Sequence, residues 1–282
     1  MIVQHNMTAL NANRQLGITN SSLAKRTEKL SSGYRVNRAA DDAAGLSISE
    51  KMRGQIRGLN QASRNAQDGI SLIQTAEGAM NEIHSVLQRM RELTVQASND
   101  TYVTADRLAI AKEVRALTSE ITRIATQTEF NKMKLLSGGF KGKVLQVGAN
   151  TSQTIKFSIA KLTAGALGVS SIEVAAKLEE YAKLKTGSGE KITALISIVN
   201  CAISKVSDQR SALGALQNRL DHTVANADNM AENLQSSESK IRDANLADEM
   251  VAYSSSSILQ QAGQSMLAQA NQATQGILSL LG

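Results

Sequence analysis

The chain has 282 residues, 42% of them hydrophobic but only 2% aromatic, and it contains no Pro. Large compact cores use aromatic volume and proline interrupts helices, so this composition favours long helices with narrow aliphatic contacts over a single globular core. The formal charge of +6 does not predict nucleic acid binding, because Lys and Arg are spread along the chain near acidic residues and no basic run alternates with aromatic side chains.

The N-terminal stretch repeats apolar residues at intervals of seven, at Ile2, Ala9, Leu16, Leu23 and Leu30. Asparagines stand between them, at Asn6, Asn13 and Asn20. This pattern predicts a coiled-coil helix in which buried polar residues fix the register at a cost in stability. The first formal charge is Arg14 and no continuous apolar run precedes it, so we expect no cleaved secretion signal.

A short irregular stretch follows, with Gly33 and Gly45 as expected helix breaks and Asp41 and Asp42 as caps of the next helix. That next helix is expected to end near Asn99, which makes it about 80 Å long at 1.5 Å per residue. A second helix, from about Thr104 to Thr128, should run antiparallel to it after a short connection.

Beyond Lys134 the apolar period changes to two, which predicts a small hairpin near residues 140–160. The range 171–189 contains a Gly-Ser loop and is expected to be a short surface loop. A third long helix then begins near Lys191 and keeps a regular stripe as far as Ile241. Cys201 lies beside this stripe, and we expect it to be partly buried.

The C-terminal stretch from Met250 has no Asp, Glu, Lys or Arg over 33 residues, the difference between 282 and 249. Its apolar residues alternate at steps of three and four: Leu259, Ala262, Met266, Ala270, Ala273, Ile277 and Leu280. Gln residues interrupt the apolar runs, so membrane insertion is not expected. We interpret this stretch as a helix surrounded by other protein and pair it with the N-terminal helix.

No catalytic or cofactor-binding pattern is present. His5, His84 and His222 lack a second ligand at metal spacing, and the glycines around Phe140 have the wrong spacing for a phosphate loop. We therefore expect no enzyme activity, no cofactor and no metal site.

Several long motifs in sequence order resemble bacterial flagellin: MIVQHNMTALNANRQL at the start, the segment from SSGYRVNRAADDAAGL to AEGAMNEI, and KIRDANLADEM, MLAQANQ and LSLL at the end. The resemblance covers nearly the whole chain. It implies a mainly α, elongated antiparallel helical bundle with a small β-hairpin, in which residues 1–43 and 240–282 form paired terminal helices. Residues 44–170 and 190–239 would form the second domain, and 171–189 would replace the variable outer region of longer flagellins.

The resemblance also implies a function. The chain would be exported by the flagellar type III route and would polymerise into the bacterial flagellar filament, with an export chaperone, cap proteins and junction proteins as partners. A hook-filament junction protein and a flagellin-like binding module remain alternatives. Assembly residues would include those of the two terminal stripes: Leu16, Leu23, Leu30, Leu259, Met266, Ile277 and Leu280.

The segment LQRMREL resembles the site at which a Toll-like receptor binds flagellin monomers. The candidate receptor-binding residues are Gln88, Arg89, Leu93 and Glu113. Packing between subunits is an alternative role for Arg89 and for its neighbour Glu92.

Overall fold

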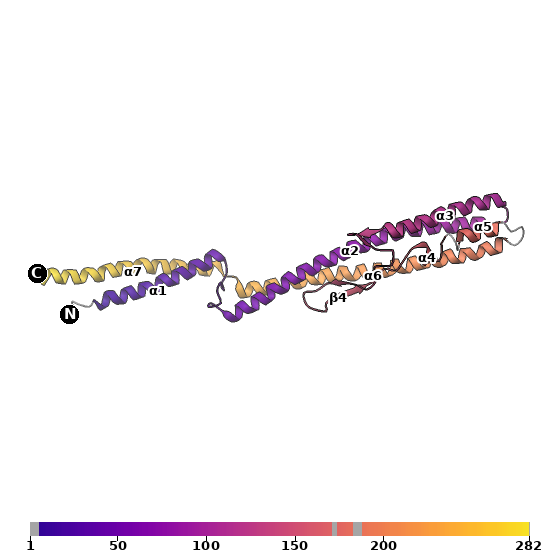
Figure 1. Cartoon of the computed structure of the whole chain (residues 1–282). Helices are drawn as coiled ribbons and strands as arrows, with labels where there is room; N and C mark the ends of the chain where they lie inside the picture. The colour runs from indigo at the N-terminus through magenta and orange to yellow at the C-terminus, as the bar shows by residue number, and fades with distance from the viewer. Residues whose placement is uncertain (1–5, 171–173, 183–187, 282) are drawn as a thin grey trace. The chain divides into compact units, whose positions relative to one another are not determined.

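In this computed structural model, the described residues are 6–170, 174–182 and 188–281, and side chains are not described for 188–190 and 274–281. The chain divides into two compact units, residues 1–56 with 232–282 and residues 57–231. The fold is mainly α, as expected, with seven helices and two small antiparallel sheets among the described residues (Figure 1). No helix in the described part has an apolar stretch that could span a membrane.

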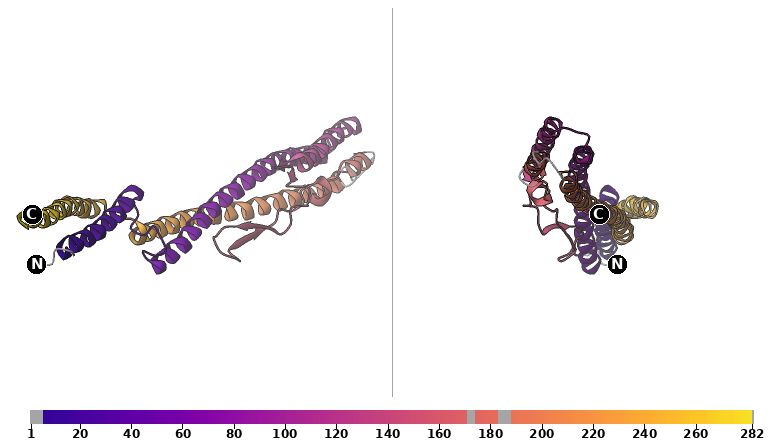
Figure 2. Two further views of the ribbon diagram at one scale, coloured as in Figure 1. Left: turned by 60° about the vertical axis from the view of Figure 1, so that its left-hand side comes forward. Right: turned by 90° about the vertical axis from the view of Figure 1, so that its right-hand side faces the viewer.

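The first unit contains the two terminal helices, α1 (Met7–Ser32) and α7 (Leu246–Leu281). They pack side by side and antiparallel, since residues near the start of α1 contact residues late in α7 and the reverse holds at the other end (Figures 1 and 2). The side chain of Asn6 caps α1 by accepting a hydrogen bond from the amide of Ala9. Gly33 ends the helix with a φ of 74°, a left-handed conformation that glycine adopts without strain.

An antiparallel β-bridge between Tyr34 and Asp243 joins the two connections that follow α1 and precede α7. Helix α2 (Ala43–Ser98) starts next, with the carboxylate of Asp42 accepting from the amide of Gly45 at 2.8 Å. The expectation that Gly45 breaks the helix is therefore wrong, because Gly45 lies in the first turn that Asp42 caps. Asp41 instead holds the preceding loop by accepting from the amide of Arg38 at 3.1 Å.

The second unit is built on α2, α3 (Thr104–Gln127) and α6 (Ser188–Arg242). Its core is aliphatic and continuous, and its fully buried side chains come from all three helices: Ile73, Met80, Ile83, Leu87, Met90, Ile121, Val199, Val206 and Leu220. The predicted stripe of α6 shifts near its end, where Met230 is 47% exposed and Ala231 is buried. A straight helix has 3.6 residues per turn, so a strict heptad stripe drifts around it. Cys201 is exposed, which contradicts the expected burial.

The hairpin predicted near residues 140–160 consists of β3 (Lys143–Gln146) and β4 (Thr154–Phe157). A second, two-residue pairing of β1 (Glu129–Phe130) with β2 (Met133–Lys134) was not predicted, because strands this short have no measurable period. The β3–β4 hairpin packs against α2 at two glycines. A Cβ on Gly58 would lie 2.8 Å from the Cβ of Ala149, and one on Gly69 would lie 2.6 Å from Leu145.

Residues 171–189 are not simply a surface loop. Helix α5 (Ala176–Ala182) follows the short α4 (Ala164–Leu167), and Leu178 and Ala182 of α5 are buried. Arg115 of α3 forms an ion pair with Glu179 at 2.6 Å. No apolar period is recognisable here because α5 has only about two turns. Of the Gly-Ser loop predicted at residues 186–189, Thr186 and Gly187 lie outside the described residues, whereas Ser188 and Gly189 belong to the first turn of α6, so the loop prediction is wrong for these two residues.

Candidate assembly and recognition surfaces

The seam between α1 and α7 is made of small and polar contacts. Leu16 packs against Gly263, where an added Cβ would approach its side chain to 3.3 Å. The amide of Gln260 donates to Asn20 at 2.9 Å, and the side chain of Asn6 donates to the carbonyl of Ala270 at 2.9 Å. Helix α1 has no buried residue. The pair is therefore in register but has little apolar core of its own.

The α7 side of this seam differs from the predicted stripe. Its half-buried positions include Tyr253, Ser256, Gln260, Gly263, Leu267 and Ala270. Leu259 and Met266 are instead 58% and 66% exposed. Leu16, Leu23 and Leu30 of α1 do lie half-buried in the seam. Ile277 and Leu280 lie outside the described side chains.

Both terminal helices also carry exposed apolar side chains outside the half-buried seam positions. On α1 these are Met7, Leu10 and Ile18, and on α7 they are Val251, Ile258, Leu259 and Met266. With 3.6 residues per turn, Val251 and Ile258 fall roughly opposite the α7 seam positions, whereas Leu259 and Met266 lie at the edge of the seam and line a groove with Leu16 and Thr19 of α1. Exposed apolar side chains that gather on one pair of helices are typical of a protein interaction site. The predicted α7 stripe is therefore offset from the observed seam, in which Ala270 is half-buried while Leu259 and Met266 are exposed.

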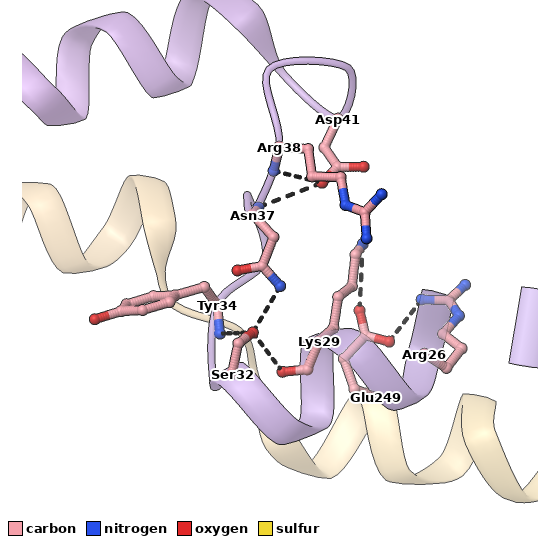
Figure 3. Close-up of polar contacts among 8 residues, drawn as sticks. All are labelled: Arg26, Lys29, Ser32, Tyr34, Asn37, Arg38, Asp41 and Glu249. Carbon is pink, nitrogen blue, oxygen red and sulfur yellow. Dashed lines mark hydrogen bonds and ion pairs between the residues drawn. The ribbon is translucent and has the colours of Figure 1, made fainter. Parts of the chain in front are cut away.

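A buried carboxylate joins the two helices near the start of α7 (Figure 3). Glu249 is 9% exposed, and its two oxygens contact Arg26 at 2.7 Å and Lys29 at 3.7 Å, both on α1. We call these three residues the Glu249 clamp. Carboxylates are rarely buried without partners, so the clamp favours the one register that brings Arg26 and Lys29 to Glu249.

The loop beside the clamp is held by its own hydrogen bonds (Figure 3). The hydroxyl of Ser32 accepts from the amide of Tyr34 at 3.1 Å and from the side chain of Asn37 at 2.7 Å. Hydrogen bonds from the amides of Arg38 and Asn37 lower the pKa of Asp41. These hydrogen bonds favour the ionised form of the Asp41 carboxylate.

The candidate receptor residues lie on α2 and α3. Arg89 donates to Glu113 through Nε at 3.1 Å and Nη2 at 3.0 Å, and it pairs with Glu92 at 3.1 Å. These contacts, Glu92 first, raise the pKa of Arg89. Arg89 and Glu113 are both exposed, and Gln88 is half-buried beside His84. Leu93 is only 2% exposed, so its side chain supports the core and is not available as a contact residue.

The described residues contain no group of three His, Cys, Asp or Glu side chains suited to a metal ion.

Comparison with known proteins places this architecture in a class. The crystal structure of Bacillus cereus FlgL shares the fold with a TM-score of 0.52 at 16% identity, covering 67% of this chain and 99% of that one. Family models of the bacterial flagellin N-terminal and C-terminal helical regions match residues 3–141 and 196–281. A flagellin of Halalkalibacterium halodurans is 51% identical and one of Bacillus subtilis 48% identical, with 100% of each chain covered in both cases.

The chain belongs to the bacterial flagellin family. Flagellins are exported structural proteins of the bacterial flagellar filament, and the family is not a family of enzymes. The resemblance found in the terminal motifs is thereby confirmed over the full length of the chain.

Proposed function

We propose that this chain polymerises into the flagellar filament through its terminal pair, the helices α1 and α7. The observation that carries the proposal is the exposed apolar surface of both helices, which includes Leu259 and Met266 at 58% and 66% exposed. Neighbouring copies would cover this surface. Fully burying a side chain of this size contributes about 1.5 to 3 kcal/mol, so a few such contacts per subunit supply a substantial driving force.

Assembly and folding of the terminal pair are coupled in this proposal. Ordering one residue costs about 1 to 2 kcal/mol of backbone entropy, and α1 offsets that cost with no buried side chain. Contacts with other copies would provide the missing burial. We therefore infer that the two ends are largely unfolded in the free monomer and become helical on joining the filament.

The same exposed surface accounts for the other partners that we propose. An export chaperone would cover the apolar residues of the terminal pair before assembly. Cap and junction proteins would contact the subunits at the two ends of the filament. A hook-filament junction protein remains the rival function for this chain, and the two are separated by whether the chain elongates a seed or only binds its end.

We also propose that a Toll-like receptor recognises the monomer at Gln88, Arg89 and Glu113. Two exposed and opposite charges on adjacent helices support this, because Arg89 can exchange its contact with Glu113 for a bidentate contact with a partner. Leu93 is not part of the proposed receptor site, because its side chain is buried. If subunits cover these residues in the filament, the receptor would contact them only on the monomer. Receptor binding of Arg89→Ala, with Arg123→Ala as an exposed control on α3, would test the proposal, and unchanged binding of both would contradict it.

The assembly proposal is tested by growing filaments from short seeds and imaging them by electron microscopy. The variant Leu259→Gln/Met266→Gln keeps the helix and removes two exposed apolar side chains, so its growth should fall by tenfold or more, as should that of a chain lacking residues 250–282 (about 1.4 kcal/mol per tenfold). The control Gln264→Ala/Gln272→Ala changes the polar side of α7 and should have a much smaller effect. Normal growth of the Leu259/Met266 variant would contradict the role of this surface.

A further inference from the structure

Most of the net charge of this chain is concentrated in one short segment. Residues 128–163 contain six Lys, no Arg and one acidic residue, Glu129, so six minus one leaves +5 of the total charge of +6. The expectation that basic residues are evenly balanced along the chain is wrong for this segment. We call it the lysine ribbon.

The lysine ribbon is an extended antiparallel structure in the second unit. Beyond the β3–β4 ladder, the amide of Ile159 donates to the carbonyl of Phe140 at 2.9 Å and that of Leu162 to the carbonyl of Leu136 at 3.0 Å. The inner side chains are buried in the core, as Phe140 and Ile159 are. The ribbon is thus fixed to the helices, and its charges have a defined position.

All six lysines are exposed: Lys132, Lys134, Lys141, Lys143, Lys156 and Lys161. Lys134 forms an ion pair with Glu129 at 2.8 Å. Within the described part of the chain, no ion pair to a carboxylate is found for the other five. Lys143 pairs with Phe157 and Lys156 pairs with Val144, so these two lysines lie on opposite faces of the β3–β4 ladder. The ribbon thus carries positive charge without counter-charges on both faces, and a segment of this kind attracts an acidic partner.

The surface between these lysines favours a protein over a polyanionic polymer. Val144 is 54% exposed and lies opposite Lys156 in the β3–β4 register, so an apolar side chain stands next to the charges. An acidic polymer would leave it without a contact. Nucleic acid is disfavoured because Phe140 and Phe157 contact each other and the core and offer no stacking surface.

A complementary surface exists on α6 of the same unit. Asp221, Ala225 and Asp228 are exposed and lie on one side of the helix, at spacings of four and three residues. Neither aspartate has an ion-pair partner among the residues that the structure describes. We call these three residues the acidic stripe. A small side chain between two carboxylates matches an apolar side chain among lysines.

We propose that the lysine ribbon of one subunit docks on the acidic stripe of a second copy in the filament. The inference rests on the proposed polymerisation, which places many copies of both surfaces side by side. Repeated uncompensated ribbons would repel one another, and this contact would neutralise each of them. It would also select one lateral arrangement, because ribbon against ribbon and stripe against stripe are both repulsive.

Seeded growth of charge-reversed chains tests the contact. The variants are Lys141→Glu/Lys156→Glu in the ribbon and Asp221→Lys/Asp228→Lys in the stripe, and all four side chains are exposed, so folding should be preserved. Growth of each alone should fall about tenfold or more at low salt, because each places like charges against each other. An equimolar mixture of the two variants should recover most of the growth rate, since each then meets an oppositely charged neighbour.

The control is Lys112→Glu/Lys205→Glu, which makes the same change in formal charge at exposed positions on α3 and α6. It should grow like the parent. Parental growth of the ribbon variant, or failure of the mixture to recover, would overturn the inference while leaving the proposed filament function in place. If the ribbon variant grew normally but was no longer retained on a heparin column, the ribbon would bind a polyanion, and the inference would also be overturned. If the parent chain itself did not grow, the filament function would fall first and this inference with it.

Discussion

The two ends of this chain and its central unit are both built from helices but differ in how those helices are stabilised. The helices of residues 57–231 share a continuous core in which Met80, Leu87 and Val206 are fully buried. The terminal pair has Leu16 against Gly263 and a charged clamp at Glu249, and many of its larger apolar side chains are exposed. We therefore expect the central unit to be stable by itself and the terminal pair to require neighbouring copies.

The largest expected contrast between the two regions is in amide hydrogen exchange of the dilute monomer. Amides of α1 and α7 should exchange about a hundredfold or more faster than those of α2 near Leu87, because exchange protection follows local stability. Mass spectrometry of peptides from both regions would measure it. Protection of both ends at the level of α2 would show that the terminal pair folds without assembly.

A core truncation should sharpen the contrast. Leu87→Ala leaves a cavity at a fully buried site and should lower the free energy of unfolding by about 2 to 5 kcal/mol. Leu16→Ala makes the same chemical change in the seam of the terminal pair. It should lower the free energy of unfolding by less than about 1 kcal/mol. Urea unfolding of the monomer, followed by circular dichroism, compares the two. Equal losses would mean that the seam contributes to the stable core.

The glycines of α2 provide a comparison within the central unit. Gly58→Ala would force the hairpin away from α2, since the new Cβ meets the backbone of Ala149 at 3.1 Å, and should cost about 1 to 3 kcal/mol. Gly78→Ala has open space and should stabilise by about 1 kcal/mol through helix propensity. Thermal unfolding would show shifts of opposite sign. A stabilising Gly58→Ala would mean that the hairpin does not depend on this close approach.

Breaking the Glu249 clamp should weaken the terminal pair alone. Glu249→Gln leaves Arg26 and Lys29 without a carboxylate and should cost about 1 to 2 kcal/mol, a value reduced because Arg26 is partly exposed. The control Glu28→Gln removes the exposed pair with Arg38 and should have little effect. The measurement is the protection of α1 amides in assembled filaments. If the α1 amides were equally protected in Glu249→Gln and Glu28→Gln, the Glu249 clamp would not determine the register of the two helices.

The smallest expected effect is a pH dependence in the loop beside the clamp. The pKa of Asp41 in the folded chain is below its ordinary value of 3.8. The ionised carboxylate therefore stabilises the folded loop at pH values above 3.8, and this stabilisation is lost as the pH falls through the folded pKa. The amide shifts of Asn37 and Arg38 should follow this titration in nuclear magnetic resonance spectra. Asp41→Asn should abolish the dependence. A titration at or above the ordinary value would contradict the hydrogen bonds to these amides.

Local patterns predicted the helices well. The absence of proline, the apolar stripes and Gly33 placed α1, α2, α3 and α6 close to their observed bounds, because helix formation depends on residues three and four positions apart. Alternating residues likewise predicted the β3–β4 hairpin. The short β1–β2 pairing and α5 escaped prediction, since each is too short to show a period.

What the sequence determined by itself was which residues form helices and which stripes are apolar, together with the flagellin family through its long terminal motifs. The tertiary structure decided what each stripe faces. It turned Leu259 and Met266 outward, placed Leu93 inside the core and exposed Cys201. Periodicity records only that a helix has an apolar side. The partner of that side is set by the distant residues that pack against it, as Glu249 shows by meeting Arg26 more than 200 residues away.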